Sequence, residues 1–183
     1  TLSAYCTRLT PVDYLDQNSL MLEVGGSLDE KVFIANLVDS GYRRVESVFE
    51  HGDFAVRGGL IDLFPMGSEQ PYRIELFDDE IESLRSFDSE TQRTLHGVDQ
   101  VMILPANEVR LDNEGINNFR DQWHLEFKAD PDHCPIYQDT VTGVASAGVE
   151  SYLPMFFDAT STLHDYFSSD KDATATKATY VLP

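Results

Sequence analysis

The sequence has few basic residues, and this shortage limits which partners the chain can bind. Thirteen Lys and Arg stand against 32 Asp and Glu, so the formal net charge at pH 7 is −19. Tight binding to a nucleic-acid backbone depends on clustered Lys and Arg that neutralise phosphates. The charge balance therefore argues against direct binding to DNA or RNA and favours a protein partner.

Cysteine and long apolar runs are also scarce. The two cysteines, Cys6 and Cys134, are far apart and form no Cys-x-x-Cys pair, so neither a zinc site nor a disulfide framework follows from them. No hydrophobic stretch is long enough to cross a bilayer, and no signal-peptide pattern is present. We therefore expect a cytoplasmic protein with no membrane contact. The start at Thr1 and the strand-like residues 180–183 suggest a piece of a longer chain.

Recognisable catalytic and cofactor motifs are missing as well. No Gly-x-x-x-x-Gly-Lys-Ser/Thr phosphate loop occurs, and Gly58-Gly59 follows a strand arginine, so we expect a β-bulge or a close backbone approach there. The five histidines lack metal-ligand spacing, and no Ser–His or Cys–His motif supports a hidden hydrolase. Asp78-Asp79-Glu80 lacks the glycine and spacing of a calcium loop and fits a hairpin turn. We expect no catalytic residue, cofactor or metal.

What the sequence does contain is a globular α+β pattern. Hydrophobic residues make up 42% of the chain, which indicates a packed core. Ser27 and Glu30 have capping-box spacing ahead of an apolar helical stripe that begins at Phe33, and Gly41 suits the left-handed position that ends a helix. Strand-like segments lie at 21–24, 42–49, 53–63, 72–77, 80–87 and 98–104.

Beyond Pro105 the pattern becomes helical. Asp112 or Asn113 can cap a helix whose apolar residues recur at helical spacing as far as Phe127. A weaker helix candidate follows at 136–144, and a Ser/Thr-rich loop at 168–179 precedes a final strand. We divide the chain into a connecting segment at 1–18, in which Pro11 limits regular structure, a first domain at 19–105, and a second domain at 106–183.

The strand at 72–77 carries the most informative side chains. Period-two alternation places Arg73, Glu75 and Phe77 on the face opposite to the apolar one. A phenylalanine on the charged face of a half-buried strand is poorly explained by folding alone. An aromatic side chain beside an arginine is, in contrast, a common composition at the centre of protein interfaces.

The stretch RGGLIDLFPMGSEQPYRIELFDDEIESLRSFDSETQRTL, Arg57 to Leu95, resembles the second domain of the bacterial transcription-repair coupling factors, the Mfd family. A looser likeness extends to the excision-repair protein UvrB. A second match lies in GVESYLPMFF, Gly148 to Phe157, followed by TLHDYF, Thr162 to Phe167. The Ser89–Thr94 tail resembles the coupling factors rather than UvrB.

The resemblance implies a fold and a role. It identifies 19–105 as domain 2, a small mixed α/β domain with an antiparallel sheet, and 106–183 as part of domain 1B, an α/β domain, with domain 1A missing. It implies that domain 2 binds UvrA through Arg57, Arg73 and Phe77, and Glu75 lies between two of these on the same strand face. The parent would be an ATP-driven DNA translocase whose contacts with RNA polymerase and DNA belong to other domains.

Two other interpretations stay open at this point. The chain could be a fragment of UvrB, taking part in the recognition of damaged DNA. Alternatively, Arg57 and Arg73 could pair only with acids of their own chain, while Phe77 packs on a neighbour. Arginine forms forked bonds to carboxylates in either situation, so the residue types alone do not separate an interface from an internal ion pair.

We predict that this chain neither hydrolyses ATP nor binds duplex DNA at physiological salt. The phosphate loop is missing, and a net charge of −19 opposes the release of counterions from DNA. A fluorescence titration with labelled duplex and an ATPase assay check both points. A tight affinity that weakens steeply with salt would contradict the prediction.

Overall fold

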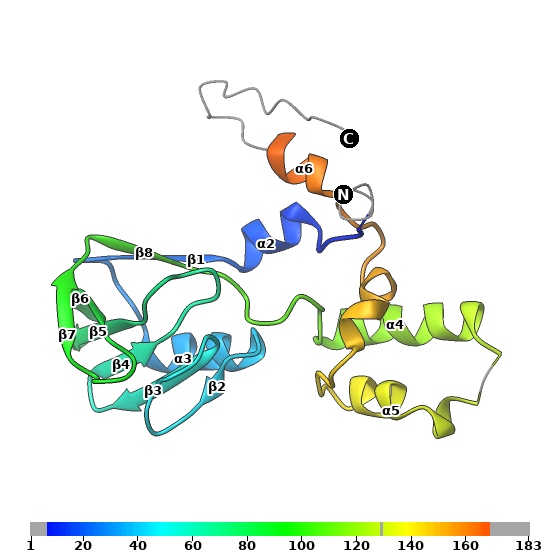
Figure 1. Cartoon of the computed structure of the whole chain (residues 1–183), viewed down its shortest axis with the longest axis horizontal. Helices are drawn as coiled ribbons and strands as arrows, with labels where there is room; N and C mark the ends of the chain where they lie inside the picture. The colour runs from blue at the N-terminus through cyan, green and yellow to red at the C-terminus, as the bar shows by residue number, and fades with distance from the viewer. Residues whose placement is uncertain (1–6, 129, 169–183) are drawn as a thin grey trace. The chain divides into compact units, whose positions relative to one another are not determined.

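The computed structural model describes residues 7–128 and 130–168, which divide into two compact units (Figure 1). One unit covers residues 18–107. The other unit is made of two stretches of the chain, the residues up to Gln17 and those from Glu108 onward. Cys6, most of the predicted loop at 168–179 and the predicted final strand lie outside the described residues. The mixture of helices with a largely antiparallel sheet confirms the α+β fold class.

A six-stranded sheet forms the body of the 18–107 unit. Its order is β2-β3-β4-β5-β6-β7, and all neighbours are antiparallel except β2 and β3. The strands are β2 (Arg43–Arg44), β3 (Asp53–Arg57), β4 (Leu60–Leu63), β5 (Tyr72–Phe77), β6 (Glu80–Phe87) and β7 (Thr94–Gly97). A separate two-stranded sheet pairs β1 (Leu20–Glu23) with β8 (Gln100–Ile103).

Helix α3 (Glu30–Asp39) covers one face of the large sheet. Its buried residues Phe33 and Leu37 join a core that includes Phe54, Ile61 and Ile74. These residues face the helix because apolar side chains alternate along the strands with a period of two. The main hydrophobic core therefore lies between α3 and this face.

The ends of α3 show where local sequence signals succeed and where they fail. The predicted cap at Ser27 is wrong: Asp29 is the N-cap, and its side chain accepts bonds from the amides of Lys31 and Val32. Ser27 instead forms a β-bridge with Glu80 of β6, a contact that a local pattern cannot encode. Gly41 has a φ of 89° as expected, and the amides of Gly41 and Tyr42 close the helix end in a Schellman motif.

The strand segments also need correction. Of the predicted strand at 42–49, only residues 43–44 form strand pairing, with β3. The predicted single strand at 53–63 is instead the hairpin of β3 and β4, with Gly58-Gly59 as its turn. The close backbone approach is confirmed there, because a Cβ on Gly59 would lie 2.9 Å from the carbonyl oxygen of Leu76. Strand β7 was not predicted, because all four of its residues are exposed and give no alternating pattern.

The second unit is helical in its described residues. Helix α2 (Val12–Asn18) starts directly after Pro11, so the expectation that this proline limits regular structure in the segment is wrong, because a helix accepts proline at its start. Asp112 caps α4 as expected, through the amide of Gly115. The remaining elements are α4 (Asn113–Glu126), η1 (Pro131–His133), α5 (Pro135–Val141), η2 (Val149–Met155) and α6 (Leu163–Ser168). The assignment of this unit to domain 1B stays a prediction.

Residues 18–107 expressed alone should unfold in one cooperative transition. They should also be more stable than residues 19–105 by about 1 kcal/mol, because the amides of Ala106 and Asn107 both donate to the carbonyl oxygen of Ser40. That difference corresponds to a melting temperature higher by roughly 4–8 °C in a domain of this size. Thermal melts followed by circular dichroism measure both points, and equal melting temperatures would contradict the longer boundary.

Candidate interaction surface

The face of the large sheet opposite to α3 carries the predicted site residues. Asp62 of β4 lies opposite Arg73 of β5, and Leu60 lies opposite both Arg57 of β3 and Glu75 of β5. Alternation therefore brings the four predicted residues, together with Asp62, to one side of the sheet. We call this set the outer face: Arg57, Asp62, Arg73, Glu75 and Phe77.

One end of the same side of the sheet is covered. Val48 from the β2–β3 loop packs with Ala55, Phe64 and Phe87 in a small second cluster, and all four are buried. The side-chain amide of Gln92, in the β6–β7 loop, donates to the Val48 carbonyl oxygen at 3.0 Å and so joins that loop to the β2–β3 loop. At the other end, which carries the outer face, the side chains of Arg57 and Phe77 are exposed. The sequence pattern did not reveal this cover, because it depends on residues far apart in the chain.

Arg73 is held tightly within its own domain. Its Nε and Nη2 atoms donate to the two carboxylate oxygens of Asp62 at 2.7 and 2.9 Å, and its Nη1 donates to Thr94 Oγ1 at 3.2 Å. Its guanidinium carbon lies 4.8 Å from the centre of the Phe87 ring. These hydrogen bonds to Asp62 raise the pKa of Arg73 above its usual value. Only 15% of its side chain is exposed, so the internal ion pair considered above does form.

Arg57 is more available. Half of its side chain is exposed, and its Nη2 donates to the carbonyl oxygen of Glu46 at 3.0 Å. The same nitrogen lies 3.8 Å from Asp62 Oδ2, the outer limit of an ion pair. Arg57 thus extends from the edge of the Asp62–Arg73 pair with much of its guanidinium open to a partner.

Phe77 is the aromatic residue of the outer face, and it is largely exposed. Its side chain is 70% accessible, and it belongs to neither hydrophobic cluster of the 18–107 unit. Glu75, two residues away along β5 and on the same face, accepts a 2.5 Å hydrogen bond from Ser83 Oγ and lies 3.4 Å from Arg85 Nη2. Glu75 is therefore engaged with β6, whereas Phe77 is free to be covered.

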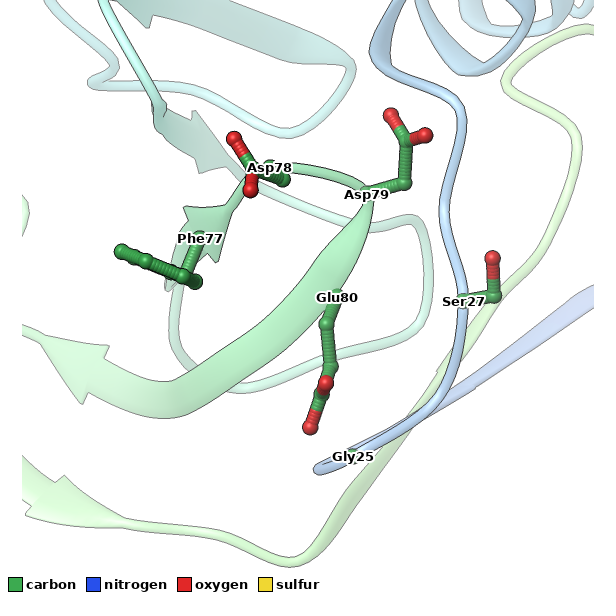
Figure 2. A pocket seen from close by; sticks show the side chains of 6 residues that line it. All are labelled: Gly25, Ser27, Phe77, Asp78, Asp79 and Glu80. Carbon is green, nitrogen blue, oxygen red and sulfur yellow. The ribbon is translucent and has the colours of Figure 1, made fainter.

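The β5–β6 turn beside Phe77 forms one wall of a shallow groove of about 410 Å³ (Figure 2). The opposite wall is the segment Gly25–Ser27, which is tied to β6 by hydrogen bonds between Gly26 and Ile81 and between Gly25 and Ile81. Figure 2 shows the carboxyl groups of Asp79 and Glu80 pointing in opposite directions. The acidic residues of this turn thus occupy a hairpin, as expected, and do not converge.

Two negative findings concern the described residues, 7–128 and 130–168. No group of three or more His, Cys, Asp or Glu side chains in them could hold a metal ion. No helix in the same residues is long and apolar enough to cross a membrane.

Comparison with known proteins defines the class of this domain and then its family. Residues 20–109 match the model of the UvrB interaction domain. The chain is 45% identical over 168 residues to the transcription-repair-coupling factor of Haemophilus influenzae and 44% identical over 166 residues to that of Escherichia coli. These alignments cover 90% and 89% of this chain but only 14% of each relative. The factor of Staphylococcus aureus is 44% identical over 62% of the chain. The chain belongs to the transcription-repair-coupling factor family.

Two substitutions on the outer face should differ sharply in their effect on folding. Arg73→Ala should lower the free energy of unfolding by about 3 kcal/mol, because it leaves the buried Asp62 carboxylate without its main partner. Phe77→Ala should change it by less than about 0.5 kcal/mol, as is usual for an exposed side chain. Urea unfolding of both variants measures the difference. A strong destabilisation by Phe77→Ala would mean that this side chain serves the core.

Proposed function

We propose that this chain is a non-catalytic adaptor that binds UvrA through the outer face of its 18–107 unit. In this role it recruits nucleotide excision repair to RNA polymerase stalled on damaged DNA. The observation that carries the proposal is the exposure of Phe77 and of the half-exposed Arg57 on the same side of the sheet, in a domain that matches the UvrB interaction family. A large aromatic residue and an arginine, both accessible, form the composition of an interface centre.

The four residues play different parts in this proposal. Phe77 supplies apolar area that a partner can bury at a low cost in side-chain entropy. Arg57 offers guanidinium N–H groups to a carboxylate of the partner. Arg73 contributes the edge of its guanidinium group that Asp62 does not occupy. Glu75 holds Ser83 and Arg85 of the neighbouring strand β6 in place.

The rest of the coupling activity belongs to the parent protein in this proposal. The chain spans about 14% of the length of the curated relatives from Haemophilus influenzae and Escherichia coli. DNA translocation driven by ATP, and the contacts with RNA polymerase and DNA, are assigned to the other domains. The alternative of a UvrB fragment is not favoured, because the relatives named above are transcription-repair-coupling factors.

Arg57→Ala and Phe77→Ala should each weaken binding to UvrA by at least about thirtyfold, the effect of losing about 2 kcal/mol at an interface centre. Titration calorimetry with purified UvrA measures the dissociation constants. Two matched substitutions in the other unit serve as controls. Arg120→Ala removes an exposed arginine that also donates to a backbone carbonyl, and Phe167→Ala removes an exposed phenylalanine.

The controls should bind UvrA like the unaltered chain. If all four variants bind equally well, the outer face is not the binding site. If the unaltered chain does not bind UvrA at all, the adaptor function itself is wrong.

A further inference from the structure

We propose that Asp62, a residue with no exposed surface of its own, is a positioning residue that presets both arginines of the outer face for a partner carboxylate. This inference rests on the proposed function and deepens it, because it identifies what holds the binding groups in place. It concerns a residue that would never touch the partner. Only 1% of its side chain is accessible.

Asp62 touches both arginines at once. Its Oδ1 accepts from Arg73 Nε at 2.7 Å, and its Oδ2 accepts from Arg73 Nη2 at 2.9 Å and lies 3.8 Å from Arg57 Nη2. One carboxylate therefore fixes the plane of one guanidinium and attracts the end of the other. Without this carboxylate the two cations would repel each other, and Arg57 would keep only its bond to the Glu46 carbonyl oxygen and Arg73 only its bond to Thr94 Oγ1 among the side-chain hydrogen bonds described above.

The geometry leaves part of Arg73 available. Asp62 occupies the side formed by Nε and one hydrogen of Nη2, while Thr94 takes one hydrogen of Nη1. A guanidinium has five N–H donors, so one hydrogen on each of Nη1 and Nη2 is left for another acceptor. These two atoms form the end of the guanidinium that a second carboxylate can bind in a forked arrangement.

Folding alone gives little reason for a charge at this position. The cross-strand neighbour of Asp62 on β3, Ala55, and the Phe87 ring beneath Arg73 are buried and apolar. A buried ion pair is a weak source of stability compared with a well-packed apolar pair. Its value here is that the two arginines are ordered before the partner arrives, which lowers the entropy lost on binding.

The 18–107 unit contains a matched control for the test. Asp53 is also buried and pairs with an arginine: its Oδ1 accepts from Arg43 Nε at 3.0 Å and from Arg43 Nη2 at 2.8 Å. It lies on the same strand as Arg57 but four residues away, roughly 13 Å along β3. Asp53→Asn and Asp62→Asn therefore remove similar charges, and only the second removes a residue that holds arginines of the outer face.

The experiment measures UvrA affinity of the full chain and of both variants by calorimetry, well below their melting temperatures. Asp62→Asn should weaken binding at least about tenfold, whereas Asp53→Asn should stay within about twofold of the unaltered chain. In an Arg57→Ala background, the loss caused by Asp62→Asn should be smaller, because one of the two oriented groups is already gone. Comparable losses for Asp62→Asn and Asp53→Asn would overturn the positioning role, as would full affinity of Asp62→Asn.

A measurement on the unaltered chain covers the case in which Asp62→Asn does not fold. Nitrogen-15 NMR should show slow solvent exchange for the Arg73 Nε–H and fast exchange for the Arg57 Nε–H. Equal, fast exchange of both would overturn the proposal. If Arg57→Ala and Phe77→Ala weaken binding but Asp62→Asn does not, only this inference fails. If the unaltered chain does not bind UvrA, the adaptor function fails and the inference with it.

Discussion

The register between β4 and β5 is the constraint on which both sides of the large sheet depend. Ile61 lies opposite Ile74, and Asp62 lies opposite Arg73, so one alignment sets the hydrophobic core on one side and the ion pair on the other. A slip of one residue would exchange the two sets and bring a carboxylate against α3. The burial of Ile61 and Ile74 therefore also fixes the geometry of the outer face, although neither residue belongs to it.

Phe87 connects the covered and the open ends of the outer side. Its ring is fully buried in the small cluster with Val48 and Phe64, and the Arg73 guanidinium lies over it. Arg73 is thus held by Asp62 on one edge and packed against the Phe87 ring, and only 15% of its side chain is exposed. In the proposed binding, stability and affinity should be separable at Phe77 and Arg57 but overlap at Arg73, since the loss of Arg73 leaves a buried charge behind.

The second unit has a core of a different kind. Phe119, Trp123 and Phe156 are buried together, and the Phe119 ring stacks on Phe156 at a centroid distance of 4.9 Å. Trp123 Nε1 and Thr140 Oγ1 are buried without a hydrogen-bond partner among the described residues. Aromatic residues spread from α4 to η2 thus build much of this core.

The sequence by itself determined the elements and the faces. Apolar spacing located α3, α4 and the β5–β6 hairpin, and alternation brought Arg73, Glu75 and Phe77 to the same side, because these patterns are local. The resemblance to coupling factors was confirmed by the comparisons, while the roles of individual residues in binding UvrA stay a prediction.

Only the tertiary structure decided the partners of each side chain. Asp62 and Arg73 are 11 residues apart in the sequence, and Val48 and Phe87 belong to different loops and strands. Capping-box spacing could not choose Asp29 over Ser27 as the cap, since the β-bridge of Ser27 to Glu80 is a long-range contact. A side chain takes the partner that the whole fold brings within hydrogen-bonding distance, and the local pattern carries no information about that distance.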